Sequence, residues 1–205
     1  MLSSLTFSPK GSRLAVVSSD GADGSVALLD PATGREVVSI PVTPDVSTAA
    51  FTPDGKTLLV GDQGGFVHFW NARTGKSTEQ PILVNQGQVN SLDVDSTGST
   101  LVVGGTDGAT WLFDLATGTE IGTPLGPDAS TTTAALFAGV GDSTPLAVAY
   151  PNEGPPTLSR WDLHAGFLAA RACAVARRNL TRLEWEQILP NRPYAKVCAG
   201  YPLSS

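Results

Sequence analysis

Few residues in this chain of 205 could carry out catalysis. Of its two histidines, His68 alternates with Phe66 and Trp70 along an expected strand, which favours a packed side chain over a general base. His164 begins an expected helix, where a capping or surface role is the default. The aspartates fall mostly in expected turns, and no motif of a serine hydrolase, a zinc protease or a phosphate-binding loop is present. The sequence therefore predicts a protein that is not an enzyme and that has no cofactor.

The remaining reactive side chains are Cys173 and Cys198, the only two cysteines. Because an even pair flanks two expected helical segments, we expect a disulfide, which would stabilise the fold by roughly 3–4 kcal/mol through loop-closure entropy. A disulfide would indicate an extracytoplasmic location. The alternative is a pair of buried free thiols in a cytoplasmic protein. No metal is expected, because a closed zinc site needs four ligands and no histidine pair lies nearby.

The composition favours many short strands joined by tight turns. Hydrophobic residues make up 41% of the chain and charged residues 16%, and there are 22 glycines and 15 prolines. Glycine and proline supply the backbone conformations of turns and are unfavourable inside helices. No apolar run approaches the ~20 residues of a membrane-spanning helix, so we expect no membrane span in this chain.

Charge is unevenly distributed along the sequence. Residues 1–163 carry 7 lysines and arginines against 17 aspartates and glutamates, whereas residues 164–205 carry 6 against 2. An acidic body argues against nucleic acid as a partner, because binding a phosphate backbone needs clustered basic residues. We expect the basic tail to be a helix that docks on the acidic body or a helix with a solvated basic face. The alternative is that its basic residues form a patch that binds nucleic acid. We expect a protein or peptide partner and no nucleic acid.

A turn recurs four times along the chain. The glycines that end the copies are 44, 43 and 43 residues apart. The copies are Ser8–Gly11, Thr52–Gly55, Asp95–Gly98 and Ala138–Gly141. A short apolar run follows each copy, which is typical of a strand buried on both faces. A third strand then ends in an aromatic residue or leucine followed by Asp or Asn, at Leu29 and Asp30, Trp70 and Asn71, Phe113 and Asp114, and Trp161 and Asp162. The Asp or Asn can accept hydrogen bonds from the amides of the next turn.

The period, the turn and these dipeptides resemble those of WD40 repeats, the blades of β-propellers. The resemblance covers about residues 1–162 and implies an all-β, partial propeller of about four blades, at approximately residues 1–41, 42–84, 85–124 and 125–162. Asp23 and Asp107 stand where the family has its turn aspartate, whereas the second copy has Gly64 there. The usual Gly-His pair before each innermost strand is absent, so the buried Asp-His-Ser-Trp network of such blades should be incomplete.

Four blades are fewer than the seven or eight with which WD40 propellers usually close. The expected explanation is that the chain is the C-terminal part of a larger protein. The alternative is that two copies pair to make eight blades. In both cases the open blade edges should expose apolar surface and promote self-association.

Residues 163–205 form a segment of a different kind, which we expect to be an α-helical hairpin tail. The Ala-rich stretch Ala165–Arg178 favours a helix, and Thr181 with Glu184 matches a capping box that opens a second, short helix. This segment resembles a tail at the end of bacterial WD40 proteins, which often carry an N-terminal signalling NTPase of the STAND class, a protease-like domain or a regulator domain. The resemblance implies that the protein's own C-terminus is here and that its missing part is N-terminal.

The same resemblance implies a non-catalytic sensor or scaffold of a bacterial signalling protein. Propellers usually bind a protein or peptide through loops at one face of the ring. The candidate contact residues in these loops are Thr43, Asp45, Asp62, Asn85, Gln86 and Asp128. A further alternative is a propeller enzyme with carboxylates in a central channel, for which Asp93 and Asp95 are the only acids in an expected innermost strand.

Overall fold

The computed structural model of the chain describes residues 1–19, 24–42, 45–84, 87–125, 134–137, 145–150, 157–162, 173–174, 176–188 and 193–201. The chain divides into two compact units, Met1–Trp161 and Asp162–Ser205. This boundary lies one residue before the expected one. Within the described residues, no helix is long and apolar enough to cross a lipid bilayer.

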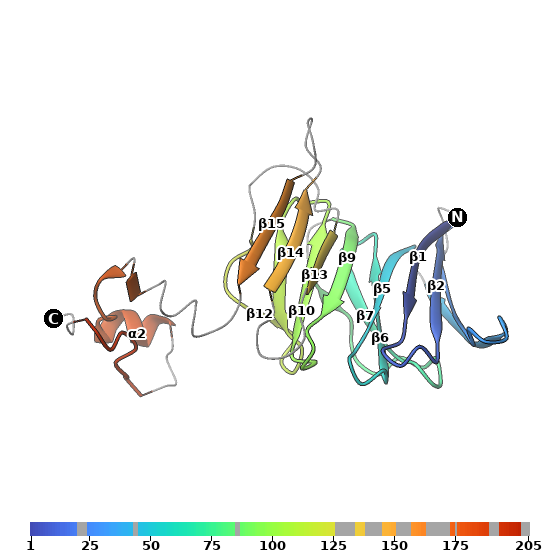
Figure 1. Cartoon of the computed structure of the whole chain (residues 1–205), viewed down its shortest axis with the longest axis horizontal. Helices are drawn as coiled ribbons and strands as arrows, with labels where there is room; N and C mark the ends of the chain where they lie inside the picture. Colours follow the sequence, from blue (N-terminus) through green and yellow to red (C-terminus); the bar gives the residue numbers. More distant parts are fainter. Residues whose placement is uncertain are drawn as a thin grey trace. The chain divides into compact units, whose positions relative to one another are not determined.

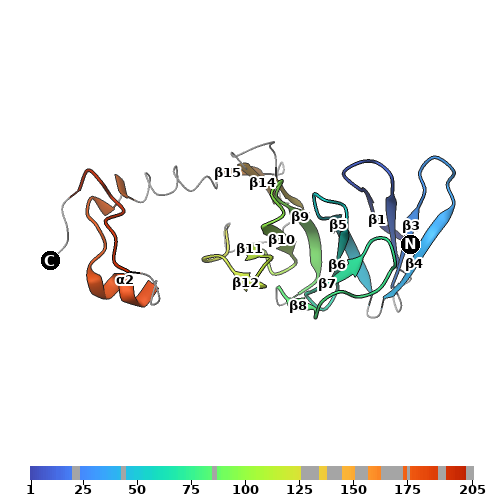
Figure 2. The same ribbon diagram turned by 90° about the horizontal axis from the view of Figure 1, so that it is seen from below.

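The first unit consists of antiparallel sheets that follow one another along the chain (Figure 1, Figure 2). The first sheet contains β1 (Leu2–Phe7), β2 (Leu14–Ser19), β3 (Gly24–Leu29) and β4 (Glu36–Val42). The second contains β5 (Val46–Phe51), β6 (Thr57–Asp62), β7 (Phe66–Asn71) and β8 (Ile82–Leu83). The third contains β9 (Val89–Val94), β10 (Thr100–Gly105), β11 (Thr110–Asp114) and β12 (Thr119–Glu120). The described strands of the fourth are β13 (Ala134–Phe137), β14 (Pro145–Tyr150) and β15 (Thr157–Asp162).

The second strand of each central sheet is buried on both faces, which confirms the prediction from its apolar run. Leu58, Leu59 and Val60 of β6 are all fully buried. Successive side chains of a strand point to opposite faces of its sheet. Accordingly, Leu58 and Val60 pack in the core between the first and second sheets, and Leu59 packs in the core between the second and third. Each core is therefore a layer between two neighbouring blades, as the all-β propeller-type fold requires.

The innermost strands β1, β5, β9 and β13 contact one another in sequence, and β1 has an uncovered outer face. On β1, Leu2, Leu5 and Phe7 are each more than half exposed, at 57%, 54% and 60%. Exposed apolar side chains that lie next to one another often mark an interaction surface. The expected exposure of apolar blade surface is therefore present on the first sheet.

The repeated turn connects the first and second strands of the first three sheets. It ends in a glycine with positive φ, +66° at Gly11, +71° at Gly55 and +77° at Gly98. Glycine adopts this backbone conformation without steric cost, which explains why it marks the period. The fourth copy of the turn, at 138–141, lies outside the described residues.

The second unit contains the short helix α2 (Arg182–Ile188) (Figure 1). Cys173, Ala174 and Ala176 are also helical, while most of the predicted helix at 165–178 lies outside the described residues. The helical turn ends at Arg177, whose amide donates to the Cys173 carbonyl at 2.9 Å and whose φ is +54°. A residue in this left-handed conformation is a common helix end.

Candidate functional site

Hydroxyl groups of the innermost strands join the second blade to the third and the third to the fourth. On β5, Ser47 Oγ donates to the carbonyl oxygens of Gly61, at 3.1 Å, and of Val89 on β9. On β9, Ser91 Oγ donates to the Ala135 carbonyl and accepts from the Ala135 amide of β13, both at 3.0 Å. The bonds to Val89 and Ala135 cross from one blade to the next, so they fix the positions of the strands around which the loops are arranged.

A polar cavity of about 340 Å³ opens at the end of the sheets where β5 and β9 begin. Nearly all of its lining side chains carry a hydroxyl or an amide, and they are Ser3, Ser19, Val46, Ser47, Gln63, Gln88 and Asn90. Such groups both donate and accept hydrogen bonds. The cavity is therefore suited to polar, uncharged groups such as those of a peptide backbone.

Asp45 holds two residues of this cavity in place. Its Oδ2 accepts hydrogen bonds from Ser19 Oγ at 2.6 Å and from Gln63 Nε2 at 2.7 Å. Asp45 is only 6% exposed, and its Oδ1 has no hydrogen-bond partner in the described part of the chain. The sequence predicted that Asp45 lies in a loop and contacts a partner directly. That prediction is corrected here, because the carboxylate is withdrawn from solvent and orients Ser19 and Gln63 instead.

Asp62, another predicted contact residue, is also buried, with 1% of its surface exposed. Its Oδ1 accepts hydrogen bonds from the amides of Gly64 at 2.8 Å and Phe66 at 2.9 Å, and its Oδ2 lies 2.9 Å from His68 Nε2. A carboxylate that is engaged in this way cannot reach a partner. Asp62 instead shapes its own turn and takes the place of the turn aspartate that is missing at Gly64.

Asp107 stands at the place of Gly64 in the third sheet and has a similar role to that of Asp62. Its Oδ1 accepts from the Ala109 amide and its Oδ2 from Trp111 Nε1, both at 3.1 Å. Trp111 and His68 occupy equivalent positions in the strand pairing of their sheets. Two turns of different sequence therefore use an aspartate to hold the same strand position.

The buried polar network of these blades is incomplete at Trp70. Its Nε1 is buried and has no hydrogen-bond partner in the described residues. An unpaired buried donor is unfavourable, and the ring is held instead by packing against the core between the first two sheets. The other predicted turn and contact residues, namely Asp23, Thr43, Asn85, Gln86 and Asp128, lie outside the described residues.

The Asp or Asn that ends the third strand closes the following turn. Each accepts two backbone amides through Oδ1, at 2.8 and 3.3 Å for Asp30, 3.0 and 3.0 Å for Asn71, and 2.9 and 3.0 Å for Asp114. The preceding Phe113 is buried in the core. Trp161 and Asp162 end β15, where Trp161 is 37% exposed.

Asp93 lies on the innermost strand β9, whereas Asp95, which the sequence placed on the same strand, follows it in the turn, and both are engaged by backbone amides. Asp93 Oδ2 accepts from the Phe137 amide of β13 at 2.7 Å, and burial raises the pKa of this carboxyl above its ordinary value. Asp95 Oδ1 accepts from the amides of Ser99 and Thr100 at 2.8 and 2.9 Å. Across the described residues, no three His, Cys, Asp or Glu side chains are grouped as ligands for a metal ion.

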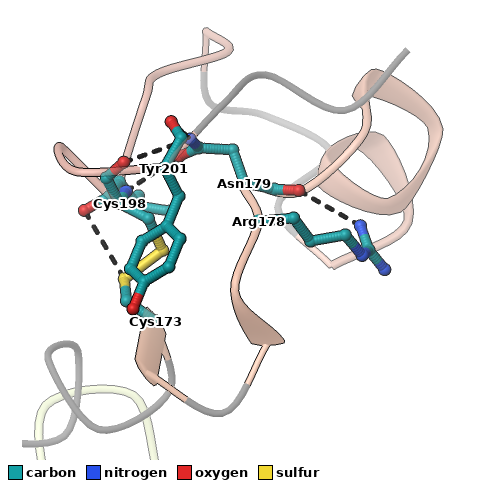
Figure 3. Close-up of a disulfide and its surroundings, with 6 residues drawn as sticks. Cys173, Arg178, Asn179, Cys198 and Tyr201 are labelled. Atoms are coloured by element: carbon teal, nitrogen blue, oxygen red, sulfur yellow. Dashed lines mark hydrogen bonds between the residues drawn. A yellow bond between two sulfur atoms is a disulfide. The ribbon is translucent and has the colours of Figure 1, made fainter.

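In the second unit, Cys173 and Cys198 form a disulfide with Cα atoms 5.5 Å apart, as predicted (Figure 3). Next to it, Asn179 is fully buried. Its Nδ2 donates to the carbonyls of Cys198 at 3.1 Å and Tyr201 at 2.9 Å, and its Oδ1 accepts from the Cys198 amide at 2.8 Å. Asn179 therefore fixes the end of the chain to the disulfide and is not the cap of the preceding helix, which ends at Arg177.

Helix α2 begins with a reciprocal pair of hydrogen bonds. The Glu184 amide donates to Thr181 Oγ1 at 3.2 Å, and the Thr181 amide donates to Glu184 Oε2 at 2.8 Å. Both carboxylate oxygens of Glu184 also accept from the Arg178 guanidinium, at 2.7 and 2.6 Å. This arrangement lowers the Glu184 pKa to about 2, with the Arg178 hydrogen bonds as the largest cause. On the opposite side, the Trp185 and Tyr194 rings meet edge to face, with centroids 5.6 Å apart.

Comparison with known proteins identifies repeats within the first unit. The family described as WD domain, G-beta repeat matches residues 37–71 and 79–114. A Periodic tryptophan protein 2 homolog of Schizosaccharomyces pombe is 38% identical over 78 residues, which are 38% of this chain and 9% of that protein. An uncharacterized WD repeat-containing protein of Nostoc sp. is 61% identical over 31 residues, which are 15% of this chain and 2% of that protein. The chain thus spans a small fraction of the curated relatives that it matches.

Solved structures share the fold at low sequence identity. The structure of U3-55K has a TM-score of 0.66 and 16% identity, and the match covers 80% of this chain and 51% of that one. Kuenenia stuttgartiensis hydrazine synthase has a TM-score of 0.68 and 19% identity, and the match covers 80% and 47%. Such likeness extends to the fold alone, and the chain spans about half the length of these structures.

Proposed function

This chain carries WD40 repeats in a β-propeller fold, and from this premise we propose that it is a non-catalytic module that binds a protein or peptide. The observation that carries the proposal is the polar cavity at the start of β5 and β9. Its amides and hydroxyls match the donors and acceptors of a peptide backbone. Because buried Asp45 already orients Ser19 and Gln63, binding would not have to order those side chains again.

The chemistry of the blade acids supports a binding role over an enzymatic one. Asp93 and Asp95 were the candidates for a carboxylate pair in a channel. Each accepts backbone hydrogen bonds, Asp93 from the neighbouring blade and Asp95 within its own turn. Carboxylates with these partners stabilise the strands and are poorly placed to exchange protons with a substrate.

The proposal is tested by comparing two variants of the full chain. Gln63→Ala with Gln88→Ala removes two amides of the cavity, while Glu79→Ala changes an exposed side chain elsewhere. A partner captured by the chain is then purified and titrated against each variant. We expect the cavity variant to bind roughly tenfold more weakly, the loss of about one net hydrogen bond. Equal affinity for both variants would reject this site.

We also propose that the chain is the C-terminal part of a bacterial signalling protein. The support is the resemblance of residues 163–205 to the tails of such proteins, together with the similarity to the Nostoc protein. The reading frame upstream of Met1 tests the proposal. Further W-D repeats and an NTPase module in frame are expected, and a stop codon directly before Met1 would reject it.

A second candidate is a half-propeller that assembles with another copy. The observation that favours it is the apolar strip on the outer face of β1, formed by Leu2, Leu5 and Phe7. Burying such residues in a subunit contact would remove them from water. Sedimentation of the wild-type chain against Leu5→Glu with Phe7→Glu tests this candidate. A monomer at all concentrations in both proteins would exclude it.

A further inference from the structure

The basic residues of the acidic blade unit are concentrated at one end of its sheets. Residues 1–162 contain seven lysines and arginines, of which all but Arg160 belong to the turns of the first two sheets. These are Lys10, Arg13, Arg35, Lys56, Arg73 and Lys76. The corresponding turns of the third sheet, 95–99 and 114–118, contain no lysine or arginine. At this end of the sheets, the lysines and arginines therefore belong to the first two blades alone.

A groove of about 690 Å³ lies between the first two sheets. Four of these basic residues line it, namely Lys10, Arg13, Lys56 and Arg73. Lys10 and Arg73 are exposed, and neither side chain has a hydrogen bond or an ion pair to a described residue. The Lys56 side chain is 80% exposed and lies 3.3 Å from Asp54 Oδ2. Arg13 is half-buried and donates to the Ser12 carbonyl at 2.8 Å. The groove thus has free positive charge available to a ligand.

The groove is a built feature, because its turns are held together. The Ala72 amide donates to the Lys56 carbonyl at 2.8 Å, which joins the two turns of the second sheet. Gly55 lies against Pro9 of the first sheet, so closely that an added Cβ would stand 3.6 Å from Pro9 Cδ. The cationic turns of two blades are therefore fixed in one arrangement.

The residue that closes the turn in this groove is an amide and not a carboxylate. Asn71 lines the groove, whereas Asp30 and Asp114 have the same place in the first and third sheets. All three accept backbone amides through Oδ1, so the turn itself does not require asparagine. The amide leaves the groove with one negative charge fewer and leaves Asn71 Nδ2 without a partner in the described residues.

A neighbouring crevice serves as an internal comparison. The crevice between the second and third sheets has a volume of about 460 Å³ and is lined by turns 52–57 and 96–98. Neither a lysine nor an arginine is among its lining residues. A crevice between turns is thus repeated along the fold, but its cationic lining is particular to the first two blades.

From this arrangement, we propose that the groove lined by Lys10, Arg13, Lys56 and Arg73 binds an acidic segment of a protein partner. The inference rests on the proposed protein-binding role and adds a second contact site with a defined ligand chemistry. Guanidinium groups bind carboxylates through paired hydrogen bonds, and Asn71 Nδ2 can donate to a peptide carbonyl. The acidic side chain of the groove, Asp54, is already engaged by Lys56 and Thr52.

An acidic peptide fits the groove better than a nucleic acid, an anionic bilayer or a single small anion does. Charges that come from three separate turns suit a ligand with several negative groups along a chain. A volume of about 690 Å³ lies within the usual range for ligand sites and exceeds the needs of one phosphate ion. A nucleic acid or an anionic bilayer would extend over the rest of the blade unit, where residues 1–163 carry 17 acidic residues against 7 basic ones. A short segment avoids that repulsion.

The test is a titration of the full chain with a short fluorescent glutamate-rich peptide, followed by anisotropy. Lys56→Glu with Arg73→Glu should weaken binding about tenfold, since two exposed attractions become repulsions. Asn71→Asp keeps the turn acceptor that Asp30 and Asp114 provide and should weaken binding about threefold. The matched control, Arg35→Glu with Lys76→Glu, makes the same change of net charge in turns at the same end of the first two sheets, at residues that do not line the groove. It should change affinity less than twofold.

Four outcomes overturn the proposal. They are absence of peptide binding, equal weakening by the groove and control variants, indifference to Asn71→Asp, and stronger binding of single-stranded DNA or phosphatidylserine vesicles than of the peptide. Circular dichroism of each variant verifies the fold, which exposed side chains should not disturb. Variants of Gln63 and Gln88 are titrated in parallel. If these leave peptide binding unchanged while groove variants abolish it, the two sites are separate, and failure of one does not decide the other.

Discussion

His68 Nε2 lies 2.9 Å from Oδ2 of Asp62, six residues earlier in the chain. The pair links a buried aspartate to the strand that follows its turn. The other oxygen of the same carboxylate accepts two backbone amides. One side chain therefore determines both the path of the turn and the position of a ring on β7.

Replacing this aspartate should destabilise the blade unit. Asp62→Ala leaves the amides of Gly64 and Phe66 and the His68 ring without their acceptor, so we expect a loss of about 2–4 kcal/mol. Asp62→Asn keeps one acceptor oxygen and should cost less. Asp54→Ala, in an exposed turn of the same sheet, should cost about 0.5 kcal/mol or less. Urea unfolding of the three variants measures these differences, and equal midpoints would contradict the role given to Asp62.

Two turn glycines provide a matched pair for steric packing. Gly34 and Gly75 both have positive φ, +68° and +65°. A Cβ at Gly34 would have no atom within 4 Å, whereas one at Gly75 would lie 2.6 Å from Val38 Cγ1. Gly34→Ala should therefore cost about 1 kcal/mol of backbone strain, and Gly75→Ala about 1–3 kcal/mol more through the clash. Thermal unfolding compares them, and an equal cost would show that the neighbouring blade yields at Val38.

The disulfide should stabilise the tail unit selectively. Cys173 and Cys198 close a loop with a sequence separation of 25, for which loop-closure entropy gives about 3–4 kcal/mol. Reduction, or Cys173→Ser with Cys198→Ser, should lower the unfolding midpoint of residues 162–205. The blade unit should be unaffected. Hydrogen exchange followed by mass spectrometry resolves the two units in one sample, and a uniform loss of protection in both would argue against this prediction.

The stability of the tail should also depend on pH through Glu184. Its pKa in the folded protein is about 2, below the ordinary 4.5, chiefly because Arg178 donates to it. A lowered carboxyl pKa stabilises the folded state fully above pH 4.5, and this contribution is lost as pH falls towards 2. Arg178→Ala should move the pKa of Glu184 back towards its ordinary range. Titration of the Glu184 carboxyl by NMR in both proteins tests the shift.

The period and the turn chemistry of the blades could be predicted from sequence because they depend on local rules. Glycine at positive φ and an Asp or Asn that accepts its own turn amides act within a few residues. The capping pair of Thr181 and Glu184 is equally local. The pairing of Cys173 with Cys198 could be predicted because the chain offers no other cysteine.

The proposed binding sites were harder to predict, because their residues meet only after the blades pack. Asp45 and Asp62 have the polarity and loop positions of contact residues, and only the structure reveals that both are buried. The cavity residues Gln63 and Gln88 lie in the same loops as the predicted contact residues Asp62 and Gln86, but neither was itself singled out. The groove cations lie in the turns at the opposite end of the sheets from the cavity, and the predicted contact residues did not include that end.

The hydroxyls of Ser47 and Ser91 have a consequence for how such a chain can grow. Each reaches the main chain of the following blade, so its partner is a backbone group that any inserted copy would also possess. A duplicated repeat would bring its own serine hydroxyl, which donates to the blade that follows it. It would also bring backbone carbonyls that accept from the blade before it. Gene duplication could therefore lengthen the array by whole blades without a compensating mutation at the new junction.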